Sequence, residues 1–284
     1  RLIRNLFALI GFFVFVWVFF VDQKGNSQLN QSWESFTSYM KSSSKKRTVD
    51  PNLPLEILKA EPVSKPLVIL DPGHGGKDGG TVSGDVLEKN LNLLLMKKIV
   101  SELSRHQVSV VTTRSEDEMI GLADRALIAN KYPNAIFISI HHNAATLNSA
   151  KGIETYYSNN KPKNLKIEQM NILKIKEGEV FNDDRSKMLA KLLHSSVCSV
   201  TQASDRGVRD RSLAMTRWVS CPSVLIECGF LTNPEEKLDL LSESYRDALS
   251  RGITEGILKY FSELNNDPYY GVSFKRAPRA IAEL

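Results

Sequence analysis

The sequence is poor in cysteine and contains no repeated unit. It has 3 cysteines among 284 residues, and their spacing does not match the cysteine pairs of a zinc finger. The three cysteines, Cys198, Cys221 and Cys228, allow at most one disulfide. Their spacing alone does not show whether it forms or which two residues form it. We interpret all three as small buried hydrophobic residues. The absence of internal repeats excludes solenoids and other repeat architectures.

The glycine-rich stretch DPGHGGKDGG, residues 71–80, lacks two common phosphate-binding patterns. It contains neither G-x-G-x-x-G nor the Lys-Ser/Thr pair of a Walker loop. A nucleotide-phosphate cradle is therefore not indicated, and we expect no nucleic-acid partner. The net charge of +5 suits an anionic polymer, although many exported proteins are basic for other reasons.

One long run, residues 6–21, contains no charged side chain and follows Arg1 and Arg4. Its length lies between that of a signal peptide and that of a spanning helix, and no A-x-A cleavage pattern follows it. We therefore expect an uncleaved membrane anchor over residues 1–22, with the rest of the chain exported. A cleaved signal segment is the alternative, and a buried core helix is disfavoured because the run is apolar on every face.

Two segments have few apolar residues or an irregular pattern. Residues 23–65 are rich in Ser, Asn, Lys and Pro, so they bury too little apolar surface to offset their ordering entropy and predict a flexible linker. Residues 266–284 are interpreted as a tail. The region between them, residues 66–265, is long enough to form one main domain.

Strand and helix patterns alternate through this region. Several strands are continuous apolar runs, which indicates a sheet that is buried on both faces. The fold class is therefore α/β, with a single twisted, mostly parallel sheet covered by helices on both faces. The expected strands are residues 67–70, 108–112, 135–140, 152–157 and 223–227, and the expected helices are residues 87–103, 122–131, 185–200 and 245–264.

Groups that bind metals or move protons follow three of these strands. His74 comes after the first, His141 and His142 after the strand FISI, and Glu227 at the end of the strand SVLI. In open α/β sheets ligands bind beyond the carboxyl ends of the strands. Each residue alone has a structural alternative, and Glu88 in particular fits a capping box with Asp85. Two histidines and one carboxylate together form a known catalytic zinc set.

The order of the motifs resembles the zinc-dependent N-acetylmuramoyl-L-alanine amidases of bacterial cell-wall turnover. The similar segments run from Leu67 to the final helix, and they are LDPGHGGKDGG, LEKNLNLLL, VVTTR, LADRALIAN, FISIHHNA, GIETYY and PSVLIECGFLTNPEE. The resemblance implies Zn²⁺ as cofactor and peptidoglycan as substrate. The bond cleaved would join the lactyl group of N-acetylmuramic acid to L-alanine, in wall remodelling or daughter-cell separation. The enzyme would then act at the exported face of the cytoplasmic membrane, in the periplasm or cell wall.

The resemblance also assigns roles to single residues. His74, Glu88 and His141 would be the zinc ligands, and Glu227 the catalytic carboxylate that moves the proton of the attacking water. His142 occupies the variable position of the motif S-I-H-x-N-A and is not a ligand. Substrate-binding roles are expected for Arg209, Arg217 and Asn143, although either arginine would serve equally well as a solvated surface charge.

Residues 158–184 form a longer connection than the following helix requires. Some members of the family carry an insertion near this point that covers the active site until a partner displaces it. We therefore interpret the segment as a possible regulatory insertion on which an activator protein acts, with a surface loop as the alternative. Two other functions stay open: a zinc peptidase acting on another wall bond, and an inactive membrane-tethered wall-binding or division-scaffold protein.

Overall fold

The computed structural model describes residues 66–159, 172–173 and 183–266. The expected anchor, linker and tail, and most of the segment 158–184, lie outside these residues. Among the described helices, none has the length and apolar character needed to cross a membrane. The roles expected for the anchor and for an activator at residues 158–184 therefore stay predictions.

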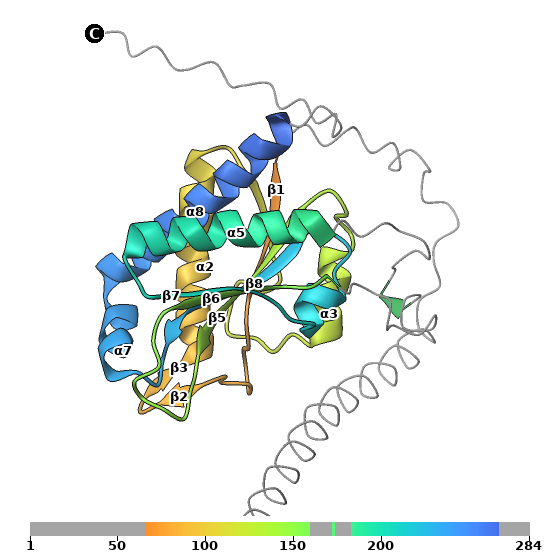
Figure 1. Cartoon of the computed structure of the whole chain (residues 1–284). Coiled ribbons are helices and arrows are strands. Elements are labelled where there is room, and N and C mark those ends of the chain that lie inside the picture. The colour runs from red at the N-terminus through yellow and green to blue at the C-terminus, as the bar shows by residue number, and fades with distance from the viewer. Residues whose placement is uncertain (1–65, 160–171, 174–182, 267–284) are drawn as a thin grey trace, which may run out of the picture. The chain divides into compact units, whose positions relative to one another are not determined.

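A six-stranded sheet forms the centre of the domain (Figure 1). The strand order is β4-β1-β5-β8-β6-β7. The first four strands in this order pair in parallel, whereas β6 runs antiparallel to β8 and parallel to β7. The strands are β1 (Leu67–Pro72), β4 (Ser109–Thr112), β5 (Ile136–Asn143), β6 (Ile153–Tyr157), β7 (Asp205–Asp210) and β8 (Ser223–Phe230). The α/β class with a mostly parallel sheet is confirmed.

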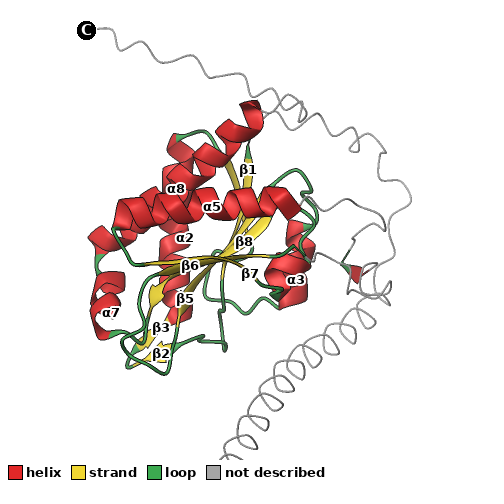
Figure 2. Ribbon diagram, viewed as in Figure 1, coloured by secondary structure: helices red, strands yellow, loops and turns green. Residues whose placement is uncertain are grey.

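Helices α2 (Glu88–Arg105), α5 (Asp183–Thr201) and α8 (Glu243–Asn266) pack together over one face of the sheet (Figure 2). Strands β4 and β5 flank β1 on opposite sides, so the chain moves one way along the sheet through α2 and back the other way through α3. Right-handed crossovers therefore place α3 (Leu122–Ala129) on the face opposite α2. The short helix α6 (Ala214–Arg217) contacts both α3 and β8. Helix α7 (Pro234–Leu241) and the hairpin of β2 (Val82–Ser83) and β3 (Val86–Leu87) complete the described elements.

The core explains why the central strands are continuous apolar runs. Ile138 and Ile140 belong to the cluster formed with α2, α5 and α8, whereas the alternate residue Phe137 is fully buried outside that cluster. Both faces of the strand are thus removed from water, so an alternating pattern would leave polar groups buried. No disulfide joins the three cysteines, and Cys221 and Cys228 are buried as expected, whereas Cys198 is only half-buried.

The sequence analysis missed β7, α6, α7 and the β2–β3 hairpin. Strand β7 reads DRGVRD and lies at the sheet edge, so it needs no apolar run. Helix α7 carried a local signal, because Asn233 accepts from the backbone N–H groups of Glu235 and Glu236 and Pro234 occupies the first turn. The other predicted elements exist, with ends displaced by up to three residues.

A buried ion pair ties β1 to α3. Asp71 is 1% exposed, and its Oδ1 accepts from Arg125 Nη1 at 2.6 Å and from Thr113 Oγ1 at 2.6 Å, while Oδ2 accepts from Ser139 Oγ at 2.7 Å. Burial alone would favour the neutral carboxyl, but the charge and hydrogen bonds of these partners outweigh it and lower the pKa of Asp71.

Replacing Arg125 by Met should destabilise the domain by about 3–5 kcal/mol, because it leaves the buried Asp71 carboxylate without its counter-ion. Urea unfolding at neutral pH measures the loss. The matched control is Lys98→Met, which removes a surface cation paired with Glu243 and Asp247 and should cost about 1 kcal/mol or less. Equal losses in the two variants would contradict the importance of the buried pair.

Candidate metal centre and active site

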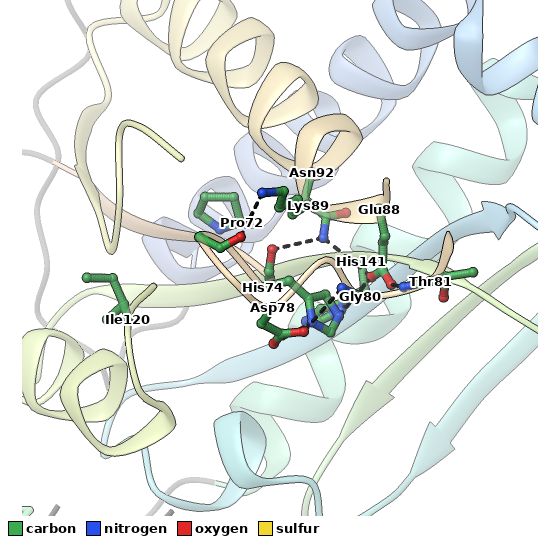
Figure 3. Close-up of polar contacts among 12 residues, drawn as sticks. Pro72, His74, Asp78, Gly80, Thr81, Glu88, Lys89, Asn92, Ile120 and His141 are labelled. Atoms are coloured by element: carbon green, nitrogen blue, oxygen red, sulfur yellow. Dashed lines mark hydrogen bonds and ion pairs between the residues drawn. The ribbon is translucent and has the colours of Figure 1, made fainter. Parts of the chain in front are cut away.

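Three separate elements bring His74, Glu88 and His141 together at the carboxyl ends of the parallel strands. His74 lies in the loop after β1, Glu88 is the first residue of α2, and His141 lies in the last part of β5. One ligand atom from each lies within 4.8 Å of the other two. Figure 3 shows the side chains of all three pointing toward one another.

Glu88 is the centre of this group. Its Oε1 is 3.3 Å from His74 Nε2 and 2.9 Å from His141 Nδ1. The backbone N–H of Thr81 donates to Oε2 at 2.8 Å, and that of His142 donates to Oε1 at 3.2 Å. The capping-box alternative is excluded, because Leu87 is the N-cap residue of α2 and forms no side-chain cap.

The charges of the site favour a cation between these side chains. Burial favours the neutral form of Glu88, but the two imidazoles outweigh it and hold the pKa of Glu88 far below its usual range. Burial likewise disfavours protonated His74, yet Glu88 and Asp78 raise the pKa of His74 to about 9. Without a metal, a proton on His74 balances the carboxylate, and a metal ion would take the place of that proton.

Two glycines of the glycine-rich stretch, residues 71–80, leave room for the candidate ligands. A Cβ on Gly73 would lie 2.2 Å from Cε1 of His141, and one on Gly80 would lie 2.6 Å from both Glu88 Oε2 and His74 Cδ2. Both distances are too short for real contacts. The glycines are therefore required by the ligands' own side chains and not only by the approach of a substrate.

The His74 loop is held in an uncommon conformation. His74 itself has a φ of 62°, a region that non-glycine residues rarely occupy. Arg125 Nη2 donates to the carbonyl of His74 at 2.6 Å, and Arg114 Nη2 donates to that of Gly73 at 2.9 Å. Asp78 Oδ2 lies 2.9 Å from His74 Nδ1, so Nε2 is the nitrogen that faces the metal position.

Sequence reasoning missed these supporting residues. Arg114 and Arg125 lie in the segments VVTTR and LADRALIAN, but their contacts with the His74 loop join residues that are distant in the sequence. A signal was present for Asp78, because a carboxylate near a metal-binding histidine commonly fixes its tautomer.

His142 lies outside the group formed by His74, Glu88 and His141. Its side chain is 1% exposed, and Nδ1 lies 2.7 Å from Asn92 Oδ1 on α2. Burial lowers the pKa of His142 to about 4, so the ring is neutral. Asn92 Nδ2 in turn donates to the carbonyl of Gly73 at 3.1 Å. His142 thus supports the ligand loop from the α2 face of the sheet.

Glu227 lies beside the ligands on the neighbouring strand. In the register of β5 and β8 it pairs with His141, so the two side chains share one face of the sheet. Burial raises the pKa of Glu227 to about 7. Its Oε2 is buried and has no hydrogen-bond partner among the described residues. Such a carboxyl group is suited to exchange protons near neutral pH.

These groups face one open cleft of about 520 Å³. The residues that line the cleft are His74, Asp78, Gly80, Thr81, Glu88, His141, His142, Asn143, Ala144 and Glu227. All four residues of the predicted zinc and catalytic set therefore meet in one cavity.

Comparison with known proteins identifies the family. A family model described as N-acetylmuramoyl-L-alanine amidase matches residues 68–259. The chain belongs to this amidase family. A curated relative, the uncharacterized protein YqiI of Bacillus subtilis, is 30% identical over 204 residues, which are 72% of this chain and 89% of that protein.

Solved structures of amidases are similar as well. The crystal structure of an N-acetylmuramoyl-L-alanine amidase from Clostridium difficile 630 is 37% identical, with a TM-score of 0.60, and the match covers 70% of this chain and 98% of that one. The CwlD amidase of Clostridioides difficile, solved in complex with the GerS lipoprotein, is 27% identical, with a TM-score of 0.58 and coverage of 70% and 100%.

The three candidate substrate-binding residues of this amidase do not lie together. Asn143 lines the cleft, and its Nδ2 donates to Glu154 Oε2 at 2.9 Å. Arg209 Nη2 lies 2.9 Å from Glu154 Oε1, so the same carboxylate holds both side chains. Arg217 is not brought to the cleft: α6 precedes β8, whereas Glu227 lies toward the far end of that strand. The unpredicted helix α6 accounts for this difference.

Leu173, in the segment 158–184, does not lie over the cleft. Its carbonyl accepts from Asn130 Nδ2 at 2.8 Å, and Asn130 also accepts from the backbone N–H of Ser220 just before β8. Leu173 therefore lies near the amino-terminal end of β8, whereas the candidate ligands lie at the carboxyl ends of the parallel strands. Residues 160–171 and 174–182 of this segment lie outside the described residues.

His74→Ala and His141→Ala should each lose one equivalent of bound zinc, because loss of a ligand weakens metal affinity severely. Elemental analysis of the purified, dialysed protein measures the metal. His106→Ala provides the control, since His106 is an exposed histidine beyond the end of α2 and should retain all zinc. Unchanged zinc in both ligand variants would exclude this metal centre.

Proposed function

We propose that this amidase hydrolyses the amide bond between the lactyl group of N-acetylmuramic acid and L-alanine in peptidoglycan. The observation that carries the proposal is the convergence of His74, Glu88, His141 and Glu227 in one cleft. Family membership supports the choice of substrate over other amides. Hydrolysis would add water across the bond, leaving a free lactyl carboxyl group and a free alanine amine.

The residues of the candidate metal centre fit zinc. Two imidazole nitrogens and one carboxylate oxygen are a donor set found in catalytic zinc sites, and the cleft leaves a further position open. Zinc bound there would polarise the amide carbonyl and lower the pKa of water. Asp78 would hold the His74 ring through Nδ1, so that Nε2 faces the metal position.

Glu227 would accept a proton from the attacking water and then transfer it to the leaving alanine nitrogen. Its position beside His141 supports this role, and so does the absence of a hydrogen-bond partner for Oε2 among the described residues. A carboxylate already engaged by arginine would be a poorer base. The pairing of Glu227 with His141 in the strand register supports one site for the proton transfer and for zinc.

The substrate would extend along the part of the cleft that Asn143 lines. Glu154 fixes Asn143 and Arg209 through its two oxygens, and Tyr156 donates its hydroxyl to Oε2 at 3.0 Å. Arg209 keeps 53% of its side chain exposed, so part of the guanidinium stays available. We expect Asn143 and Arg209 to contact the stem peptide, with Glu154 positioning both.

Glu227→Gln should retain the fold and the zinc but lose about 10²- to 10⁴-fold in rate, because an amide cannot accept the proton. Mass analysis of released wall fragments measures the rate and shows whether the muramoyl–alanine bond is the one cleaved. Glu235→Gln on α7, whose side chain is 81% exposed, should hydrolyse at the unaltered rate. If Glu227→Gln released cell-wall fragments at the unaltered rate, Glu227 would not be the proton acceptor.

We further propose that residues 6–21 anchor the chain in the membrane, with the catalytic region on the exported face. The support is the absence of charge over this run and the two arginines that precede it. The full chain should float with phospholipid vesicles in a density gradient at high salt. Recovery of the folded chain only from the aqueous fraction would contradict the anchor.

A further inference from the structure

A second group of metal-ligating side chains lies across the sheet from the cleft. His194 and Cys198 are four residues apart on α5, and Asp205 begins β7. His194 contacts Thr155 of β6, whereas the adjacent Glu154 pairs in register with Glu227. Because successive strand residues face opposite sides, this group and the cleft lie on different faces. The proposed hydrolysis uses none of these three residues.

The ligand atoms of this group are already close together. His194 Nε2 is 2.8 Å from Asp205 Oδ1 and 3.6 Å from Cys198 Sγ, and all three atoms lie within 4.8 Å of one another. Zinc binds nitrogen and oxygen at about 2.0–2.2 Å and sulfur at about 2.3 Å, which places tetrahedral ligands roughly 3.3–3.6 Å apart. Small side-chain movements would therefore suffice to enclose an ion.

A neighbouring hydroxyl group orients the His194 ring toward the other two side chains. His194 Nδ1 lies 3.0 Å from Thr155 Oγ1, and when Nδ1–H donates to this hydroxyl the lone pair of Nε2 faces Asp205 and Cys198. The His194 side chain is 5% exposed, whereas that of Asp205 is 67% exposed. One side of the group is thus open to solvent, which provides a path for an ion and a position for a water ligand.

We propose that His194, Cys198 and Asp205 bind a divalent transition-metal ion of the zinc class and thereby tie α5 to β7. A thiolate with an imidazole favours zinc, cobalt or copper over magnesium or calcium, which prefer oxygen ligands. Burial raises the pKa of the Cys198 thiol to about 11. An ion must therefore displace the thiol proton when it binds, as is usual for cysteine ligands.

Cobalt titration of the metal-free full chain tests the site, with a reductant present to keep the thiols free. A thiolate-to-cobalt charge-transfer band reports sulfur ligation, and the centre of His74, Glu88 and His141 contains no sulfur. We expect two bound equivalents in the unaltered chain, one of which produces the band. Cys198→Ser should lose the band and still bind one equivalent, and His74→Ala should retain the band with one equivalent.

Cys221→Ser is the control for the other thiols and should keep the full band. His194→Gln should weaken the cobalt affinity that the band reports by tenfold or more. Absence of the band in the folded, unaltered chain would overturn the proposal, and would mean that His194 and Asp205 form only an ion pair. A band that survives in Cys198→Ser would overturn it as well, because the sulfur ligand would then be Cys221 or Cys228.

Discussion

The buried carboxylate of Glu88 is the constraint on which the site depends. A charged group that is 3% exposed is stable only when donors or cations surround it. Two backbone N–H groups and two imidazoles meet this need. The loop after β1, the start of α2 and the end of β5 must therefore converge on one point. The same convergence creates the three-ligand site.

Two buried arginines hold the backbone of the loop that carries His74. Arg114 and Arg125 donate to the carbonyls of Pro72, Gly73 and His74, where β1 ends and the loop begins. Guanidinium groups provide several donors in a fixed plane, so each can satisfy more than one buried carbonyl. Arg125 also neutralises Asp71 at the end of β1. The loop that carries His74 is thereby fixed to the sheet core.

Much of the fold could be predicted from the sequence for local reasons, whereas the choice of Glu88 as a metal ligand depends on the family resemblance. Central strands buried on both faces are apolar runs, and the histidines and Glu227 follow such runs directly. Elements without that signal were missed: β7 is a polar edge strand, and α6 has four residues. The position of Arg217 away from the cleft depends on α6, which has no clear sequence signal. The roles of Arg114, Arg125 and Glu154 depend on contacts between distant segments, which spacing along the chain does not reveal.

The antiparallel entry of β6 gives two neighbouring glutamates different chemical environments. Glu154 and Glu227 pair directly in register, and like charges at such positions repel each other. Glu154 is surrounded by Arg206 and Arg209 and by the hydroxyl of Tyr156, so its charge is compensated. No comparable cation contacts Glu227 among the described residues, and its pKa rises to about 7. One carboxylate is thus committed to holding side chains in place, while the other is left free to exchange a proton beside the metal ligands.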